Sequence, residues 1–146
     1  MTWTIITVGK PAFAWARDAV ETYLKRIRHY ARIEHLVVRE GPRPQIESQM
    51  LGMSEKALRV IMDERGKPYR SLDLARWVEQ QQLAGTKRVC IMIGGADGHS
   101  EAFRKSAHAL WSLSSFTLQH EVALVVLAEQ IYRAHTILKG EPYHRE

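Results

Sequence analysis

The sequence has 146 residues, of which 45% are hydrophobic and 25% charged, with a net charge of +5 and one cysteine. These values are typical of one globular domain and argue against a disordered chain, and the single cysteine excludes a disulfide framework and a cysteine-rich metal site. The basic charge favours a polyanionic partner, because basic surfaces gain affinity by releasing counterions. With no apolar stretch of membrane-spanning length and no signal-peptide pattern after Met1, we expect a cytoplasmic protein without membrane contact.

The first third of the chain alternates between short β-branched segments and amphipathic ones. Residues 4–8 predict a strand, closed by a Gly-Lys-Pro turn at 9–11. Residues 13–30 predict a helix, because apolar residues recur at helical spacing and a mostly basic stripe follows the other face. That stripe is either a solvated surface or a phosphate-contacting one. A second strand over 33–39 and a weak helix over 45–56 follow.

The middle of the chain continues this alternation. A strand is predicted at 58–62, a helix at 71–83 with Ser71 as its cap, and a strand at 89–93 that is apolar at every position. A helix is expected from Ser100 to about residue 108. The order of elements predicts an α/β fold with a parallel or mostly parallel sheet, and such sheets bind ligands beyond the carboxyl ends of their strands.

The last third begins with an apolar and hydroxyl-rich segment over 110–118, followed by a long predicted helix over 120–139. The early part of this helix is apolar around its whole circumference, so it should be buried on more than one side. A short chain has little protein left to cover both sides. We therefore predict a homodimer whose interface includes Val122, Val125 and Val126.

Three motifs bear on chemistry. The turn Gly94-Gly-Ala-Asp-Gly98 after a buried strand is either a ligand loop or a tight structural turn. His120-Glu121 lacks the second histidine of a zinc motif, since Leu124 stands four residues on, and we expect no metal. In the ending Tyr143-His-Arg-Glu146, the histidine is a candidate proton acceptor, although terminal residues are normally frayed.

Taken together, several segments resemble the RlmH family, the ribosomal RNA large-subunit methyltransferase H of bacteria. The segments that carry the resemblance run in family order over nearly the full length: Val8-Gly-Lys10, Met62-Asp-x-x-Gly-Lys67, Ile93-Gly-Gly-x-x-Gly98, Ser112-Leu-Ser114 with Thr117 and His120, Glu129-Gln-Ile-Tyr-Arg-Ala134, and Gly140-Glu-Pro-Tyr-His-Arg-Glu146. The resemblance implies a single domain over residues 1–146 with a SPOUT-type α/β fold, whose C-terminal part forms a trefoil knot.

The resemblance also implies the reaction and its site residues. The cofactor would be S-adenosylmethionine, and the target N3 of a pseudouridine in 23S ribosomal RNA of the assembled ribosome. His144 would act as base or orienting group, and Arg145 would neutralise phosphate or developing ring charge. The cofactor would be held mostly by backbone groups of Met62, Gly94, Leu113, Ser114, Ser115, Phe116, Thr117 and Leu118.

Two alternatives stay open. Family members carry an arginine where this chain has Leu124, and the stretch between Arg39 and Leu58 is shorter here, so the chain is alternatively a non-catalytic RNA- or ribosome-binding paralogue. The glycine turn alone also fits a nucleotide-dependent enzyme of the flavodoxin-like or Rossmann class. Few strand–helix units and no acidic ribose clamp argue against that second alternative.

Overall fold

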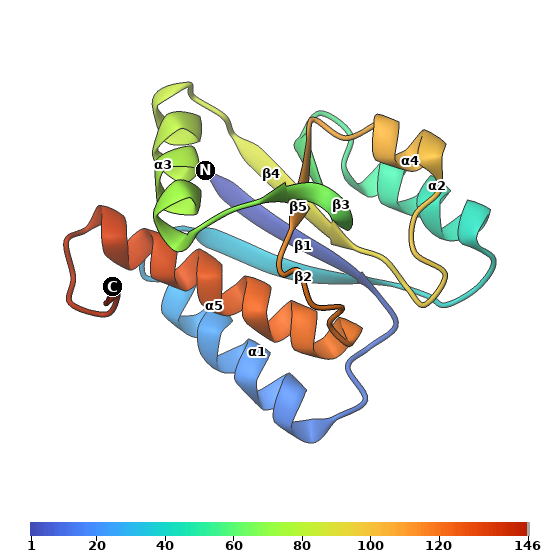
Figure 1. Ribbon diagram of the computed structural model, residues 1–146, viewed down its shortest axis with the longest axis horizontal. Helices are drawn as coiled ribbons and strands as arrows, with labels where there is room; N and C mark the ends of the chain where they lie inside the picture. Colours follow the sequence, from blue (N-terminus) through green and yellow to red (C-terminus); the bar gives the residue numbers. More distant parts are fainter. Residues whose placement is uncertain (146) are drawn as a thin grey trace.

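The structure is a computed structural model that describes residues 1–145. Along the chain, strands and helices alternate: β1 (Thr2–Val8), α1 (Ala14–Ile27), β2 (Arg32–Val38), α2 (Arg43–Met53), β3 (Leu58–Pro68), α3 (Ser71–Leu83), β4 (Arg88–Ile93), α4 (Glu101–Lys105), β5 (Ala109–Ser112) and α5 (His120–Leu138). Within the described residues the strands form one parallel sheet in the order β2-β1-β4-β3-β5 (Figure 1). The predicted α/β class is therefore confirmed.

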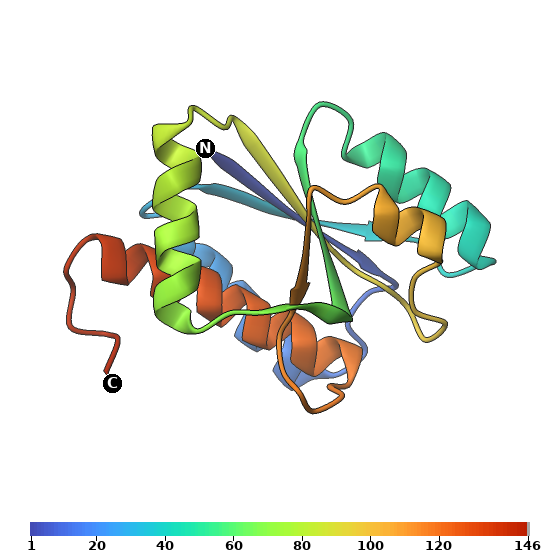
Figure 2. The ribbon, with the colours of Figure 1, turned by 45° about the horizontal axis from the view of Figure 1, so that its top comes forward.

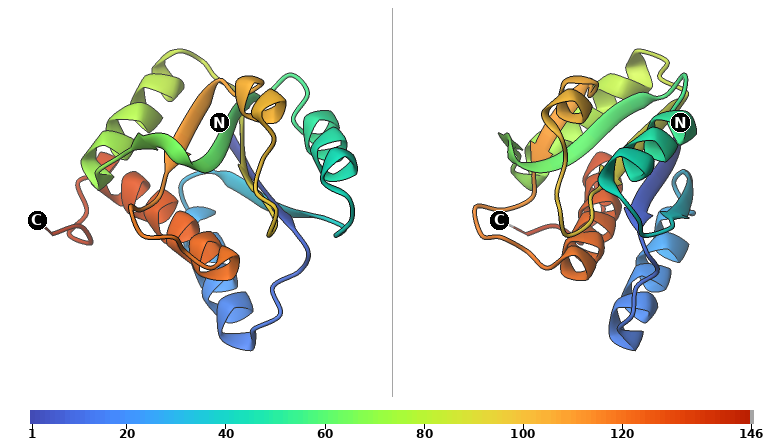
Figure 3. Two further views of the ribbon diagram at one scale, coloured as in Figure 1. Left: turned by 45° about the vertical axis from the view of Figure 1, so that its right-hand side comes forward. Right: turned by 90° about the vertical axis from the view of Figure 1, so that its right-hand side faces the viewer.

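Helices cover both faces of this sheet (Figure 3). Successive residues of a strand point to opposite faces, so Trp3 and Ile5 of β1 pack with the cluster that includes α1, α3 and α5, whereas Ile6 and Val8 pack toward α2 and α4. β4 is buried from Val89 to Ile93, as expected of a central strand with both faces covered. The sheet is thus held rigidly between two helical layers.

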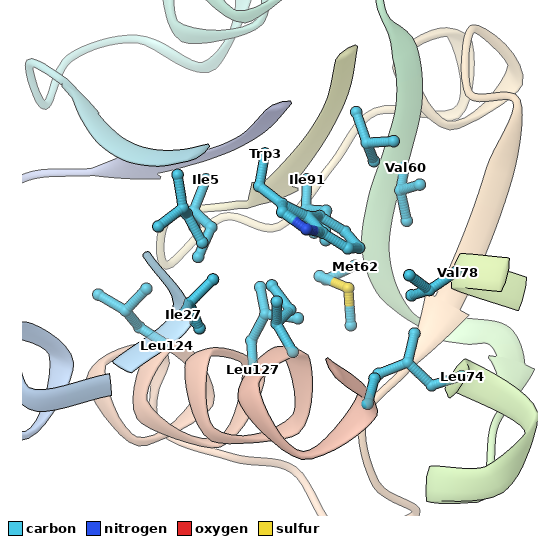
Figure 4. Packing of buried hydrophobic residues seen from close by; sticks show 14 of the residues in the cluster. Trp3, Ile5, Ile27, Val60, Met62, Leu74, Val78, Ile91, Leu124 and Leu127 are labelled. Atoms are coloured by element: carbon cyan, nitrogen blue, oxygen red, sulfur yellow. The ribbon is translucent and has the colours of Figure 1, made fainter. Parts of the chain in front are cut away.

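The larger core lies between the sheet and α5. Figure 4 shows Leu124 and Leu127 of α5 beneath Trp3 and Ile5 of β1, with Met62 between Leu127 and the α3 residues Leu74 and Val78. Leu124 and Leu127 are at most 2% exposed. Truncating a buried leucine to alanine costs about 2–5 kcal/mol, so this helix is fixed by its packing.

β3 is longer than predicted. The strand does not end at residue 62 but continues to Pro68, with an irregularity between Met62 and Lys67 in its pairing with β5. Figure 2 shows this extension crossing β5. At the crossing, a Cβ on Gly66 would lie 2.6 Å from backbone atoms of Leu110 and Trp111. Only glycine permits two chain segments to approach this closely.

Other boundaries shift by a few residues. Ser71 is the first residue of α3 rather than its cap; the cap position is Arg70, and the Ser71 hydroxyl donates to Gln130 Oε1 at 2.6 Å. α4 ends at Lys105, and the apolar stretch after it contains β5, which we had not predicted as a strand.

α5 is buried along one side only. Ala123, Leu124, Leu127 and Ala128 face the core, while Val122, Val125 and Val126 keep part of their surface exposed. Because the structure describes a single chain, the homodimer stays a prediction, and so does the trefoil knot. Among the described residues, no helix combines the length and apolar character that crossing a membrane requires.

Candidate functional site

A cleft of about 640 Å³ lies beside the irregular part of β3 and at the carboxyl ends of β4 and β5. Most of its walls come from three segments: residues 62–65 within β3, residues 93–99 at and after the end of β4, and residues 112–120, apart from Ser115, at and after the end of β5. Arg43 of α2 and Ala123 of α5 complete it. Ligand sites of small molecules have about this volume, and parallel sheets place them at this edge. The cleft is therefore the candidate ligand site.

Seven of the eight predicted cofactor residues line the cleft: Met62, Gly94, Leu113, Ser114, Phe116, Thr117 and Leu118. Ser115 lies in the same bend but is not among the lining residues. The three segments that carry these residues are separated by some 20–30 positions in the sequence. The parallel arrangement of their strands brings them together.

A buried histidine that the sequence did not single out joins two of these segments. His99 is 7% exposed, and its Nε2 lies 3.1 Å from the Met62 carbonyl oxygen. Because a carbonyl only accepts hydrogen bonds, Nε2 must carry the proton. Burial lowers the pKa of His99, although the nearby Asp63 carboxylate opposes this shift. A neutral imidazole therefore bridges Met62 in the middle of β3 to the glycine turn.

Side chains from α2 and α4 fix the glycine turn from behind. Ser100 caps α4 by accepting from the Phe103 amide, and both its backbone N–H and its hydroxyl donate to Glu47 of α2. Arg104 donates to the His99 carbonyl oxygen at 2.6 Å. The turn is held before any ligand binds, which lowers the entropic cost of binding.

The bend between β5 and α5 is built by its own hydroxyl groups. The Ser112 hydroxyl donates to the Ser114 carbonyl, and the Ser114 hydroxyl accepts from the Phe116 amide at 2.9 Å. Gln119 then caps α5 by accepting from the amides of Glu121 and Val122. These serines fix the backbone of the cleft, and the Phe116 ring stays 84% exposed at its rim.

The C-terminal tail (residues 141–145) is docked rather than frayed. The Tyr143 hydroxyl donates to Glu129 at 3.1 Å, and its ring lies 4.8 Å below the Arg133 guanidinium and edge-on to Tyr132. Burial and hydrogen bonding raise the pKa of Tyr143. His144 Nδ1 lies 3.1 Å from Arg133, and Arg145 is exposed.

Within one chain, the tail and the cleft are apart. The cleft touches α5 at its start, up to Ala123, whereas the tail contacts Glu129 and Arg133. The ten residues from Ala123 to Arg133 span about 15 Å of helix. In Figure 1 the chain ends beyond the far end of α5. The structure does not bring His144 and Arg145 to the predicted cofactor residues of their own chain.

Family members carry an arginine where this chain has Leu124, and the absence of that arginine raised the alternative of weakened RNA binding. Leu124 is 2% exposed and packs with Trp3 and Ile5 in the core. Because Leu124 is buried, its replacement of the family arginine is not evidence that this chain has lost RNA affinity. Among residues 1–145, no group of three His, Cys, Asp or Glu side chains is placed to hold a metal ion.

Comparison with known proteins identifies the family to which this chain belongs. The family model described as "Predicted SPOUT methyltransferase" matches residues 1–144. The chain belongs to the SPOUT methyltransferases. This methyltransferase is 43% identical to a ribosomal RNA large subunit methyltransferase H of Thermus thermophilus, covering 97% of the chain and 96% of the relative. It is 41% identical to the protein of that name from Deinococcus deserti, with 97% of both covered.

Solved structures show the same fold at low sequence identity. A probable methyltransferase from Bordetella pertussis matches with a TM-score of 0.59 and 15% identity, over 92% of this chain and 93% of that one. The resemblance to the methyltransferase H family is confirmed by relatives near 40% identity over nearly the whole length. Membership of the SPOUT methyltransferases replaces the flavodoxin-like and Rossmann alternative.

Proposed function

We propose that this chain transfers the methyl group of S-adenosylmethionine to N3 of a pseudouridine in 23S ribosomal RNA of the assembled ribosome. One observation carries the proposal: the preformed cleft beside the irregular part of β3 and at the ends of β4 and β5 collects seven predicted cofactor residues, in a chain about 40% identical to methyltransferases named for ribosomal RNA. The cofactor supplies an electrophilic methyl group on a sulfonium sulfur. The protein contributes positioning of the RNA base and control of its N3 proton.

The cleft fits such a cofactor. Gly94 lets the His99 ring pack directly against the turn, and the backbone of Gly94 and Gly95 lines the cleft. Met62, Leu113 and Leu118 offer apolar walls for a purine ring. The bend from Leu113 to Leu118 presents further backbone groups, held by its own serines. Recognition by backbone groups explains why no conspicuous cofactor motif stands in the sequence.

The tail is proposed to act in a partner's cleft within a homodimer. Its docking about 15 Å along α5 from its own cleft excludes direct action there while that contact persists. Partly exposed valines on α5 and the exposed rings of Phe13 and Trp15 at the start of α1 supply apolar surface for an interface. Phe13 lies beside α5, since its amide donates to Glu121. His144 and Arg145 would then contact the RNA base and its phosphate.

A basic surface supports ribosomal RNA as the partner. Arg17, Lys25, Arg28 and Arg32 are exposed on or just after α1. The ion pair between Lys25 and Glu21 is long, 3.9 Å, and joins two exposed side chains, so it adds little and leaves the lysine available to phosphate.

The deciding experiment is a methyl-transfer assay on ribosomes that lack the modification, with labelled S-adenosylmethionine. We expect one pseudouridine of 23S RNA to gain a methyl group at N3, identified by mass spectrometry of the digested RNA. Cofactor binding measured by calorimetry without any methyl transfer would instead identify the non-catalytic paralogue. With Leu124 in the core, the main observation for that alternative no longer supports it.

A further inference from the structure

A second cavity of about 300 Å³ adjoins the cofactor cleft, and we call it the side pocket. It shares three lining residues with the cleft: Met62, Ser112 and Leu113. From there it runs along α5. The cleft touches this helix at Ala123, whereas the side pocket reaches Gln130, about 10 Å further along the helix axis. The side pocket therefore has one end at the cleft and the other end at Gln130.

The walls of the side pocket suit a flat, largely apolar ring. The rings of Tyr69 and Trp111 line it, with 5.3 Å between their centroids, and Leu127 adds aliphatic surface. Aromatic side chains of this kind stack on unpaired bases of RNA. The end away from the cleft is polar, because Ser71 and Gln130 meet there.

A chain of hydrogen bonds fixes the polarity of that end. Arg133 donates to one oxygen of the Glu129 carboxylate, and Gln130 Nε2 donates to the other at 2.7 Å. Because a carboxylate only accepts, the Gln130 amide must turn its Oε1 away, and this oxygen accepts from the Ser71 hydroxyl at 2.6 Å. Ser71 Oγ keeps its lone pairs, and Gln130 keeps its second Nε2–H. An acceptor and a donor thus stand side by side.

Pseudouridine and uridine differ at one position that such a pair can read. The ribose is attached to C5 in pseudouridine and to N1 in uridine. A half-turn of one ring about the line through N3 and C6 superposes the two bases, including N3, both carbonyl groups and the ribose bond. One edge position then carries N1–H in pseudouridine and C–H in uridine. A hydrogen-bond acceptor placed there favours pseudouridine.

We propose that the side pocket receives the target base and that Ser71 determines its specificity, with Ser71 Oγ accepting from N1–H and Gln130 donating to O2. This rests on the proposed function. N3 then faces the cofactor cleft. C5 lies across the ring from C2, so a base whose O2 points into the pocket directs its ribose outward, as a base flipped out of an RNA loop requires. Val126, in the predicted dimer interface, also lines the pocket, so the partner's tail would lie near this base.

The test compares methyl transfer to two preparations of ribosomes, one with pseudouridine at the target position and one with uridine. The full-length protein is used in excess with long incubation, so that slow transfer to uridine is measurable. We expect the wild type to prefer pseudouridine at least about tenfold, the effect of one unmet buried hydrogen bond. Ser71→Ala should lower only the pseudouridine rate, bringing the two rates within about threefold. Ser71→Thr keeps the hydroxyl and should keep the preference.

Two further variants separate base recognition from a structural effect. Gln130→Met should lower both rates alike and leave the preference, because each base presents a carbonyl oxygen to this amide. Ser106→Ala, at a partly buried hydroxyl on the end of α4, is the matched control and should change neither rate. Calorimetry should show unchanged S-adenosylmethionine affinity in all four variants, because Ser71, Gln130 and Ser106 do not line the cleft.

The two proposals fail differently. If the wild type transfers no methyl group to ribosomes that carry pseudouridine, the proposed function is wrong. If it does transfer the group but shows no preference over uridine, the reading of N1–H by Ser71 is wrong and the proposed function stands. The same holds if Ser71→Ala keeps the preference or lowers both rates equally.

Discussion

The imidazole of His99 occupies the space into which any side chain at Gly94 would project. A Cβ on Gly94 would lie 2.7 Å from His99 Cε1 and 3.0 Å from Nε2, closer than non-bonded atoms approach. The same Nε2 donates to the Met62 carbonyl at 3.1 Å. Glycine at 94 and histidine at 99 are therefore a matched pair that joins Met62 in β3 to the end of β4 at the cleft.

Gly94→Ala should displace the His99 ring and break its bond to Met62, and we expect S-adenosylmethionine affinity to fall at least about tenfold, roughly one lost buried hydrogen bond. Gly94→Val should abolish binding. Calorimetry measures both, with circular dichroism to show that the fold remains. Gly52→Ala on α2, where an added Cβ meets nothing within 4 Å, is the control and should bind normally. Unchanged affinity in Gly94→Ala would place the cofactor elsewhere.

His135 should make the fold sensitive to acid. Its Nε2 accepts from the Trp3 indole at 3.1 Å, and burial lowers its pKa from 6.5 to about 4. Between these pH values His135 binds a proton in the unfolded chain but not in the folded chain. The free energy of unfolding therefore falls as the pH drops from 6.5 toward 4, by at most about 3 kcal/mol. Urea unfolding of wild type and His135→Gln measures this. Burial also lowers the pKa of His35 and His99, so the variant should lose only the part of the pH dependence that His135 contributes, whereas His29→Gln, at an exposed position, should keep it all.

Leu124→Arg should destabilise the protein and should not strengthen ribosome binding. The side chain is 2% exposed among apolar neighbours, and an unpaired charge there costs on the order of 3–5 kcal/mol. Urea unfolding and salt-dependent ribosome binding test the two parts. Leu83→Arg, at a leucine that is 81% exposed, is the control and should unfold like the wild type. A stable variant that binds ribosomes more tightly in a salt-sensitive way would show that position 124 contacts RNA.

Val126→Arg should break the predicted homodimer, because Val126 is partly exposed on the side of α5 that faces away from the core. Analytical ultracentrifugation should show a monomer, and methyl transfer should fall with the dimer, since each cleft would lose the partner's tail. Leu83→Arg again serves as control and should leave the assembly unchanged. If the dimer persists in Val126→Arg, its interface does not include this side of α5.

Mixing two inactive variants tests whether the tail acts on a partner. One variant carries Gly94→Val, with its cleft blocked and its tail intact; the other lacks residues 143–146 and keeps its cleft. After co-refolding, half the dimers are mixed and each has one complete site, so about a quarter of wild-type methyl transfer should return. If each tail served its own cleft, the mixture would stay inactive.

Much of the fold could be read from patterns local in sequence. The apolar run at 89–93 predicted a central parallel strand, and the spacing in 71–83 predicted a helix that ends at Leu83, as observed. β5 was missed because four residues give too short a pattern, and the extension of β3 was missed because Asp63-Glu-Arg-Gly66 looks like a turn. That extension exists through its pairing with β5, which comes more than 40 residues later.

The site divides in the same way. The glycine turn and the family motifs marked seven residues that line the cleft, because backbone freedom and motif order are properties of the sequence alone. His99 gave no such signal, since its importance lies in reaching Met62 across two strands. The sequence likewise left His144 and Leu124 ambiguous. Tertiary packing buried Leu124 in the core and placed His144 against Arg133, because burial and hydrogen-bond partners depend on which segments meet in space.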